Sequence, residues 1–190
     1  MPDLIIIAGA NGVGKTTFAR PYVAEMGFDF LNADDIAKTL ADAGDPSPMV
    51  AAGRVFFERL NQALDNQQSI VVETTLSGSY INKVAKRAKV LGYKIKLIYI
   101  FIESPEACLE RVKMRIVKGG HDVPEEDVKR RFYRSLSNFW DNFREMADSW
   151  FLMYNGEFGY QAIATGKTGS QSVENKVLFD KFLNLIKHDS

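Results

Sequence analysis

The sequence predicts an α/β fold in which a parallel sheet carries helices on both of its faces. Apolar runs of strand length alternate along the chain with longer stretches of helical periodicity, and this order favours parallel strands joined by crossover helices. The 190 residues are enough for one domain with a sizeable core, and 46% apolar and 25% charged residues are ordinary for a globular protein. We therefore expect a single domain over residues 1–190.

Local signals support each expected element in chain order. The first apolar run, Leu4 to Ala8, is typical of a strand that is buried on both faces. Ser47-Pro48 and Ser104-Pro105 each combine a hydroxyl cap with a proline in the first turn, which favours a helix start. The expected strands are residues 4–8, 28–32, 69–73 and 94–102, and the expected helices are residues 16–26, 36–43, 48–66, 80–91, 105–117, 124–146 and 173–187.

The carboxyl-terminal part of the chain carries weaker signals. Residues 150–155 and 160–164 fit either a terminal hairpin or two edge strands, and the sequence leaves both interpretations open. Residues 166–171 have the composition and the length of a loop rather than of a domain boundary.

Composition excludes several classes of protein. Lys plus Arg and Asp plus Glu are balanced at 24 each, so charge gives no argument for an acidic membrane and disfavours a nucleic-acid partner. Cys108 is the only cysteine, which excludes an intrachain disulfide and a cysteine-rich zinc site, and its helical context predicts a buried side chain. The longest apolar stretches are too short to span a bilayer, and Met1-Pro2-Asp3 begins no signal peptide. We expect a cytoplasmic protein without a membrane partner.

A phosphate-binding motif lies between the first strand and the first helix. Residues 9–16 read GANGVGKT and fit the pattern G-x-x-x-x-G-K-[ST] of the P-loop. Its glycines allow a nest of inward N–H groups, Lys15 can reach the β- and γ-phosphates, and the Thr16 hydroxyl can bind Mg²⁺. The alternative is a glycine-rich turn that matches by chance, but the strand before it and the helix after it argue against that. We expect a P-loop NTPase fold with ATP and Mg²⁺ as cofactors. The expected nucleotide-binding residues are Gly9, Ala10, Asn11, Gly12, Val13, Gly14, Lys15, Thr16 and Thr17.

Other motifs separate the classes of P-loop protein. A GTPase usually carries an N-K-x-D sequence, and neither Asn82-Lys83 nor Asn175-Lys176 continues in that way. Leu76-Ser77-Gly78 resembles part of an ABC ATPase signature, but it follows a strand directly and lacks the glutamine. A small-molecule kinase needs a carboxylate beside the acceptor hydroxyl, an acceptor pocket and a cationic lid over the phosphates, and the chain offers candidates for all three.

Acidic residues follow two of the expected strands. Asp34 and Asp35 come after the second strand, and Glu73 and Thr75 come at the end of the third. Because the carboxyl ends of parallel strands face the ligand crevice, these side chains are expected there. We take Asp34 as the catalytic candidate and Asp35 as the cap of the next helix. Glu73 is expected to bind the acceptor or to support Mg²⁺ through water, and Thr75 to bind the acceptor.

Arginines dominate the region that follows the fourth strand. Arg111 and Arg115 lie four residues apart on one helix, and Arg130 and Arg131 lie on the next. Gly119-Gly120-His121 between them is expected to act as a hinge, so residues 111–135 are expected to form a helical lid. The alternative is a solvated charged face in which these arginines pair with neighbouring acids. We take Arg115 and Arg131 as catalytic candidates and Arg130 as a substrate-binding candidate.

Taken together, these motifs resemble the zeta-toxin family of P-loop kinases, and most closely the short bacterial proteins described as zeta-toxin-like or as predicted ABC-type ATPases. The matching segments extend from about residue 4 to residue 155. They are GANGVGKTT (9–17), NADDIA (32–37), ETTLSG (73–78), RVKMRIVKGGHDVP (111–124) and RRFYRSL (130–136).

The resemblance implies a substrate and a role for several residues. The family phosphorylates UDP-N-acetylglucosamine, so Asp34 would be the general base toward the sugar 3′-hydroxyl. Glu73 and Thr75 would hold the UDP-sugar, and Arg115 and Arg131 would be the lid arginines. It also implies that a protein antitoxin could be a partner.

Three functions stay open from the sequence. The first is a kinase of UDP-N-acetylglucosamine or a related nucleotide sugar, and the second is a kinase of another small hydroxyl compound or of a nucleic-acid end, which the charge balance disfavours. The third is a P-loop ATPase that works as a binding module through a protein partner. The segment around Tyr154-Asn155 is a candidate for the nucleotide base, but it carries no pattern that separates ATP from GTP.

Overall fold

A seven-stranded sheet forms the centre of the computed structural model, which describes residues 1–120 and 122–187. The strand order is β2-β3-β1-β4-β5-β6-β7. The five strands from β2 to β5 are parallel, and β6 and β7 continue the sheet in antiparallel fashion. The strands are β1 (Asp3–Ala8), β2 (Asp29–Leu31), β3 (Ile70–Thr74), β4 (Lys94–Phe101), β5 (Ser149–Gly156), β6 (Gly159–Lys167) and β7 (Ser170–Val173).

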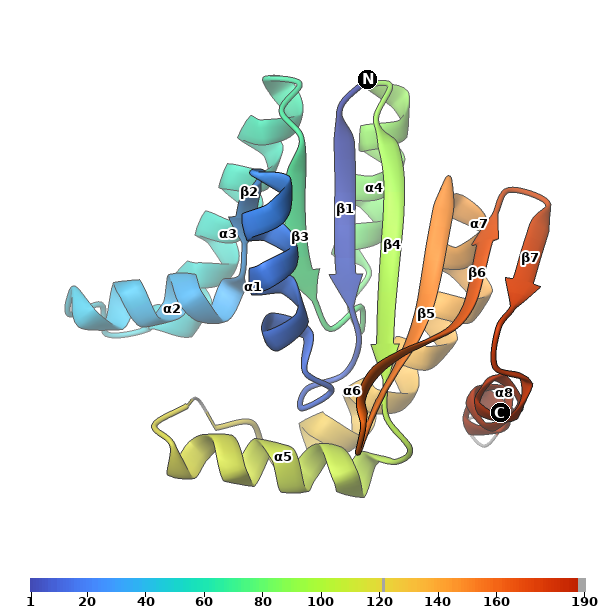
Figure 1. Cartoon of the computed structure of the whole chain (residues 1–190). Coiled ribbons are helices and arrows are strands. Elements are labelled where there is room, and N and C mark those ends of the chain that lie inside the picture. The colour runs from blue at the N-terminus through green and yellow to red at the C-terminus, as the bar shows by residue number, and fades with distance from the viewer. Residues whose placement is uncertain (121, 188–190) are drawn as a thin grey trace.

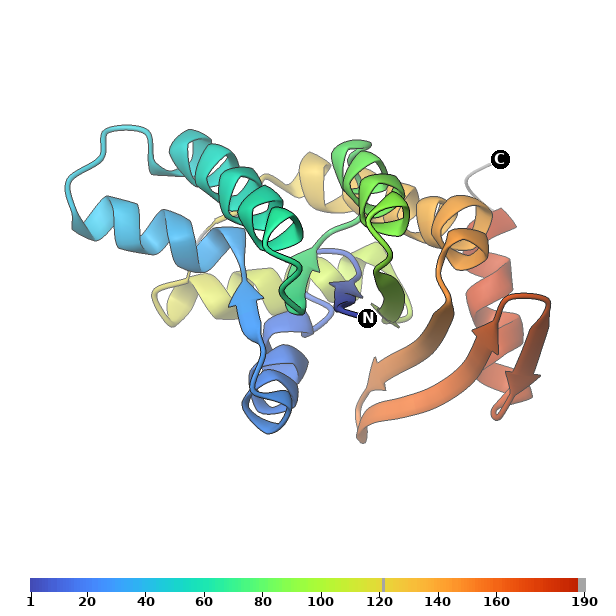
Figure 2. The same ribbon diagram turned by 90° about the horizontal axis from the view of Figure 1, so that it is seen from above.

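Helices cover both faces of this sheet, as the sequence predicts. Seen from above, α3 and α4 lie on one side of the strands and α1 lies on the other (Figure 2). The α/β fold class is therefore confirmed. The helices are α1 (Lys15–Met26), α2 (Ala33–Asp42), α3 (Pro48–Asp65), α4 (Tyr80–Val90), α5 (Pro105–Val117), α6 (Glu125–Ser137), the π-helical segment η1 (Asn138–Phe143), α7 (Arg144–Met146) and α8 (Lys176–Lys187).

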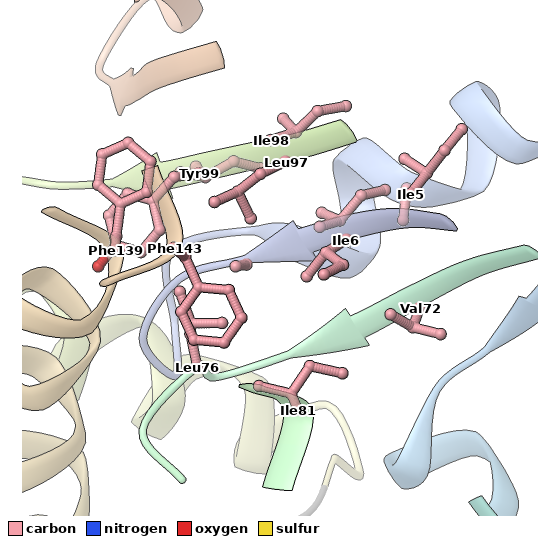
Figure 3. Close-up of a cluster of buried hydrophobic side chains, with 14 of the residues drawn as sticks. Ile5, Ile6, Val72, Leu76, Ile81, Leu97, Ile98, Tyr99, Phe139 and Phe143 are labelled. Atoms are coloured by element: carbon pink, nitrogen blue, oxygen red, sulfur yellow. The ribbon is translucent and has the colours of Figure 1, made fainter. Parts of the chain in front are cut away.

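The core lies where the central strands meet the helices. The apolar residues of β1 and β4 are almost all buried, as strands covered on both faces require. Figure 3 shows Ile5, Ile6, Leu97 and Ile98 on these two strands together with aromatic side chains from the carboxyl-terminal half of the chain. The rings of Tyr99 and Phe139, for example, stack with their centroids 4.4 Å apart.

The parallel strands bring their carboxyl ends to one edge of the sheet. In Figure 1 the arrowheads of β1, β3 and β4 point to the same edge, where α5 crosses beneath them. The loop after β1, the start of α2 after β2 and the end of β3 therefore all open toward α5. This is the place where an open parallel sheet binds its ligands.

The β5–β6 pair resolves the choice that the sequence left open, because the two strands form a hairpin and β5 also pairs with β4. Its register shifts between Leu152 and Met153, which marks a β-bulge: Leu152 pairs with Ala164, whereas Met153 pairs with Ala162.

Two expectations for individual elements were wrong. Residues 166–171 are not a loop, because β6 extends to Lys167 and a tight turn leads into β7. The last helix begins at Lys176 instead of residue 173. The expected long helix over residues 124–146 is confirmed, but its middle part is the π-helical segment η1, where the Asn138 side chain donates a 2.7 Å hydrogen bond to the carbonyl of Leu76. A short edge strand can have the same sequence pattern as a loop, and a π-helical segment, which has one extra residue in its turn, has the same pattern as an α-helix. The sequence therefore reveals neither feature.

Candidate active site

The P-loop forms a tight turn between β1 and α1. Gly9, Gly12 and Gly14 have positive φ angles of 143°, 83° and 94°, which side chains with a Cβ rarely adopt. At Gly12 a Cβ would lie 2.5 Å from the backbone oxygen of Cys108, so α5 packs directly against the loop. The sequence motif therefore has the backbone shape that a nest of N–H groups requires.

Lys15 is buried beneath this loop and turns back toward it. Its Nζ donates a 3.0 Å hydrogen bond to the carbonyl oxygen of Ala10 and lies 3.9 Å from Glu73 Oε1. Burial lowers the pKa of Lys15, and the nearby carboxylate of Glu73 opposes that shift. An anion that enters the loop would add negative charge beside this buried ammonium, in addition to that of Glu73.

Glu73, at the end of β3, joins the P-loop to the start of α2. Its two carboxylate oxygens accept hydrogen bonds from Thr16 Oγ1 at 3.0 Å and from Asn32 Nδ2 at 2.7 Å. Burial raises the pKa of Glu73, while Lys15 and these hydrogen bonds counteract the shift. Glu73 thus lies in the crevice, as expected. It contacts the Thr16 hydroxyl of the P-loop directly.

Asn32 is a site residue that the sequence reasoning missed. Its Oδ1 accepts hydrogen bonds from the backbone N–H groups of Asp34 at 2.8 Å and Asp35 at 3.3 Å, so Asn32 caps α2. The expectation that Asp35 caps this helix was wrong, because Asp35 lies inside the first turn and pairs with Arg20 at 2.9 Å. The signal was present in the sequence, since an asparagine followed two and three residues later by acidic residues is a helix-start pattern.

Asp34 faces α5 across the mouth of the site. Its Oδ2 lies 3.7 Å from Arg115 Nη1, and both side chains are partly exposed. The chain thus places a carboxylate from the first turn of α2 beside an arginine of the expected lid.

These groups surround one cavity of about 670 Å³. Its lining includes nine of the expected site residues, namely Asn11, Gly12, Gly14, Lys15, Thr16, Thr17, Asp34, Glu73 and Arg115, together with Arg111 of the expected lid. The lining also includes Asp35, Lys38, Met114, Lys118, Gly119, Gly120, Asn155 and Tyr160. The cavity is large enough for a ligand of nucleotide size.

Two expected substrate-binding residues do not line this cavity. Thr75 exchanges a 2.8 Å hydrogen bond with Ser77 in the loop after β3. Arg130 is half exposed and pairs with Asp127 one helical turn earlier at 2.7 Å, which is the solvated arrangement considered as the alternative. Arg131 binds the same aspartate at 3.1 Å, but its other nitrogen lies 3.5 Å from Asn11 Oδ1 of the P-loop.

The tip of the β5–β6 hairpin contributes two further residues, Tyr160, which sequence reasoning did not assign, and Asn155, which it named only as part of a candidate segment for the nucleotide base. Asn155 Nδ2 donates to the carbonyl of Val13 at 2.8 Å, and Tyr160 Oη donates to the carbonyl of Gly14 at 2.7 Å. Arg111 of α5 in turn donates to the carbonyl of Asn155 at 2.9 Å. No sequence spacing links residues 13 and 14 to residues 155 and 160, so only the folded chain reveals these contacts.

The donor atoms near Thr16 suit a hard cation. Mg²⁺ prefers oxygen ligands and is usually held by one or two protein groups together with substrate phosphates. The Thr16 hydroxyl and the Glu73 carboxylate fit that pattern, whereas the described residues contain no group of three His, Cys, Asp or Glu side chains that could hold a metal by themselves. His121 of the expected hinge lies outside the described residues. Among those described, no helix is both long enough and apolar enough to cross a membrane.

The sequence of this chain matches a known protein family and also an individual protein. Residues 4–134 match the family described as the AAA domain. A protein of Haemophilus influenzae with no assigned function is 32% identical over 128 residues, which cover 67% of this chain and 91% of that protein.

Solved structures show the same fold at low sequence identity. A chain of the AvrRxo1-ORF1:AvrRxo1-ORF2 complex, in its structure with ATP, superposes with a TM-score of 0.73 at 24% identity over 96% of this chain. The match spans 63% of that longer chain. A chain of the PezAT chromosomal toxin-antitoxin system of Streptococcus pneumoniae superposes with a TM-score of 0.65 at 15% identity, covering 99% of this chain and 87% of that one. The chain therefore shares its α/β fold with these structures.

Proposed function

Because this chain belongs to the AAA domain family and carries a P-loop in the α/β fold that it shares with these solved structures, we propose that it is an ATP-dependent kinase of a small molecule. The observation that carries the proposal is that the P-loop, Asp34 and Arg115 line one and the same cavity. Phosphoryl transfer needs a phosphate cradle, a group that orients the acceptor hydroxyl and cationic charge over the transferred group. The cavity offers all three.

In this proposal the loop residues Gly9 to Thr17 hold ATP. The N–H groups of the loop and the amino end of α1 bind the phosphates, and Lys15 exchanges its hydrogen bond to Ala10 for a phosphate oxygen. Thr16 and Glu73 would hold Mg²⁺, which neutralises charge on the β- and γ-phosphates when it is bound. The similarity to a structure that contains ATP supports the choice of nucleotide.

Asp34 is proposed to accept the proton of the acceptor hydroxyl. The hydroxyl oxygen then forms a bond to the γ-phosphorus while the bond from that phosphorus to the β–γ bridging oxygen breaks, and ADP leaves. Arg115 and Arg131 would stabilise the charge that spreads over the transferred group. Arg115 already lies at the mouth of the cavity, and Arg131 reaches the P-loop through Asn11.

The acceptor is proposed to be anionic, with UDP-N-acetylglucosamine or a related nucleotide sugar as the first candidate. Lys38 on α2 and Lys118 after α5 line the cavity on the side of Asp34. Within residues 1–120 and 122–187, neither ammonium lies within 4.0 Å of a carboxylate. Two cations that form no ion pair with a described carboxylate favour an acceptor that carries phosphate or carboxylate groups. Another small anionic hydroxyl compound fits the same observation.

We further propose that residues 1–190 form one domain and that residues 111–135 act as a lid. Gly119 has a φ of 82° in the connection between α5 and α6, where a change of backbone angles would turn one helix relative to the other. Closure would bring Arg115 and Arg131 closer to the phosphates and exclude water.

A protein antitoxin is proposed as a partner, and the cytoplasm, where ATP and nucleotide sugars are available, as the location. The similarity to the PezAT system, which is a toxin-antitoxin pair, supports the first of these ideas. Co-expression of this chain with the product of an adjacent gene, followed by purification through a tag on one of them, tests for a stable complex.

Mass spectrometry of products tests the kinase activity. Purified protein, Mg·ATP and UDP-N-acetylglucosamine should yield a phosphorylated nucleotide sugar, and the Asp34→Asn and Lys15→Ala variants should yield none. If the wild-type protein gives no sugar product, the same assay with a panel of anionic and neutral hydroxyl compounds decides between another acceptor and no kinase activity. ATP hydrolysis without any phosphorylated acceptor would contradict the kinase proposal and favour a nucleotide-dependent binding module.

A further inference from the structure

We propose that Asn155 and Tyr160, at the tip of the β5–β6 hairpin, are positioning residues that aim two backbone N–H groups of the P-loop at the bound phosphates. The proposal rests on the proposed function only in that the loop binds a nucleotide. It assigns a role to a part of the chain that lies more than 130 residues from the loop in sequence.

The two side chains bind consecutive carbonyl groups of the loop. Asn155 donates to the carbonyl of Val13 at 2.8 Å, and Tyr160 donates to the carbonyl of Gly14 at 2.7 Å. Both distances are those of well-formed hydrogen bonds. The contact is also close, since a Cβ on Gly14 would lie 2.5 Å from Asn155 Nδ2 and 2.8 Å from Tyr160 Oη.

Because the peptide unit is planar, the hydrogen bonds to the carbonyls of Val13 and Gly14 also fix the direction of the N–H groups that follow them. In a trans peptide the C=O of one residue and the N–H of the next lie in one plane and point in opposite directions. The described chain contains no cis peptide bond. Holding the carbonyl of Val13 toward the hairpin therefore directs the N–H of Gly14 away from it, and holding the carbonyl of Gly14 does the same for the N–H of Lys15.

The hairpin is built to hold both donors in place at once. Asn155 and Tyr160 are direct partners in the β5–β6 register, so their side chains lie on the same face of the hairpin. The ring of Tyr160 packs edge-on against Phe18 of α1 with centroids 5.3 Å apart, and Arg111 binds the backbone carbonyl of Asn155. These contacts fix each donor from a second side, which is what a positioning residue requires.

Removal of single donor groups tests this role. Tyr160→Phe keeps the ring against Phe18 and loses only the hydroxyl, and Asn155→Ala loses the amide. Tyr93→Phe is the matched control, because the Tyr93 hydroxyl donates to the carbonyls of Ala63 and Gln68, away from the loop. The probe is Mg·ADP, measured by titration calorimetry, with the amide NMR signals of Gly14 and Lys15 and the melting temperature recorded for each variant.

The expected result is an ADP affinity about fivefold to tenfold lower in Tyr160→Phe and in Asn155→Ala, with shifted amide signals for Gly14 and Lys15. Tyr93→Phe should lower the melting temperature and leave the ADP affinity within about twofold of the wild type. An unchanged affinity in both hairpin variants, or an equal loss in Tyr93→Phe, overturns the proposal. If the hairpin variants weaken ADP binding but no acceptor is ever phosphorylated, the kinase proposal fails and this one stands. A wild-type protein that binds no ADP overturns both.

Discussion

The carboxylate of Asp34 and the guanidinium of Arg115 lie 3.7 Å apart and join the start of α2 to α5 across the mouth of the cavity. In this arrangement the proposed base faces an arginine. A nucleotide phosphate is a stronger partner for a guanidinium than a partly exposed carboxylate is, because it offers more charge and more acceptor oxygens. Nucleotide binding would therefore draw Arg115 away and leave Asp34 available to the acceptor, which favours binding of ATP before the acceptor.

Asp34→Asn should separate catalysis from folding. We expect kcat to fall about 10²-fold to 10⁴-fold, because the amide cannot take the hydroxyl proton. The melting temperature and the Mg·ADP affinity should stay close to those of the wild type, since the side chain is half exposed and contacts no P-loop residue. Asp42→Asn, at the exposed end of the same helix, is the control and should retain full activity. Turnover near the wild-type rate in Asp34→Asn would remove this residue from the mechanism.

Lys38→Gln and Lys118→Gln test the charge of the acceptor. Each variant is expected to raise KM for an anionic acceptor about threefold to tenfold while kcat and KM for ATP change less than about twofold, since only one partly solvated ion pair is lost. Lys113→Gln provides a matched loss of charge on α5 outside the cavity. Steady-state kinetics with anionic and neutral acceptors would reveal the effect, and equal KM changes for both kinds of acceptor would refute it.

Arg131 and Arg130 should differ although they are neighbours in sequence. Arg131 reaches Asn11 of the P-loop, so Arg131→Ala is expected to lower kcat/KM for ATP about tenfold or more. Among the residues that the structure describes, Arg130 pairs only with Asp127 at the surface, so Arg130→Ala should change kcat/KM less than about twofold. Measuring the two variants side by side would show whether the lid contributes its charge through Arg131. Equal losses in both would mean that closure brings Arg130 into the site as well.

Cys108 should be unreactive in the folded protein. Its side chain is buried behind the P-loop, and burial raises the pKa of the thiol to about 12, so the nucleophilic thiolate is scarce at pH 8. A thiol reagent such as iodoacetamide should modify the native protein very slowly and the denatured protein within minutes, as intact-mass measurement can follow. Rapid labelling of the native protein would show that α5 opens away from the loop on the timescale of the reaction.

The sequence predicts those parts of the site that local patterns encode. The P-loop is contiguous, and its strand and helix are typical of phosphate-binding loops, so Lys15 and Thr16 could be placed before the structure. Asp34 and Glu73 could be placed because each follows a strand whose end must reach the ligand edge of the sheet. In these cases the pattern and the function lie within a few residues of each other.

Contacts between distant segments could not be predicted in the same way. Asn155 and Tyr160 reach the loop only after β5 has paired with β4 and β6 has folded back, and this pairing leaves no mark on the spacing between residues 14 and 160. Arg130 and Arg131 look equivalent in the sequence, and one residue of helical rotation separates the exposed side chain from the one that reaches the P-loop.

The bulge in the β5–β6 hairpin shifts the alternation of side chains between the two faces of the hairpin. The pairing before the bulge and the pairing after it therefore place different residues on the same face. Up to Leu152 the pairing is set by the sheet, with Trp150, Leu152 and Ala164 buried in the core. If that phase continued to the tip, Gln161 would stand opposite Asn155 and Tyr160 would turn to the other face, away from the loop. The single unpaired residue of β6, Ile163, resets the count between the two halves. The part of the hairpin that packs in the core and the tip that contacts the P-loop therefore have separate pairing registers. A substitution in one part need not change which side chains of the other part face the loop.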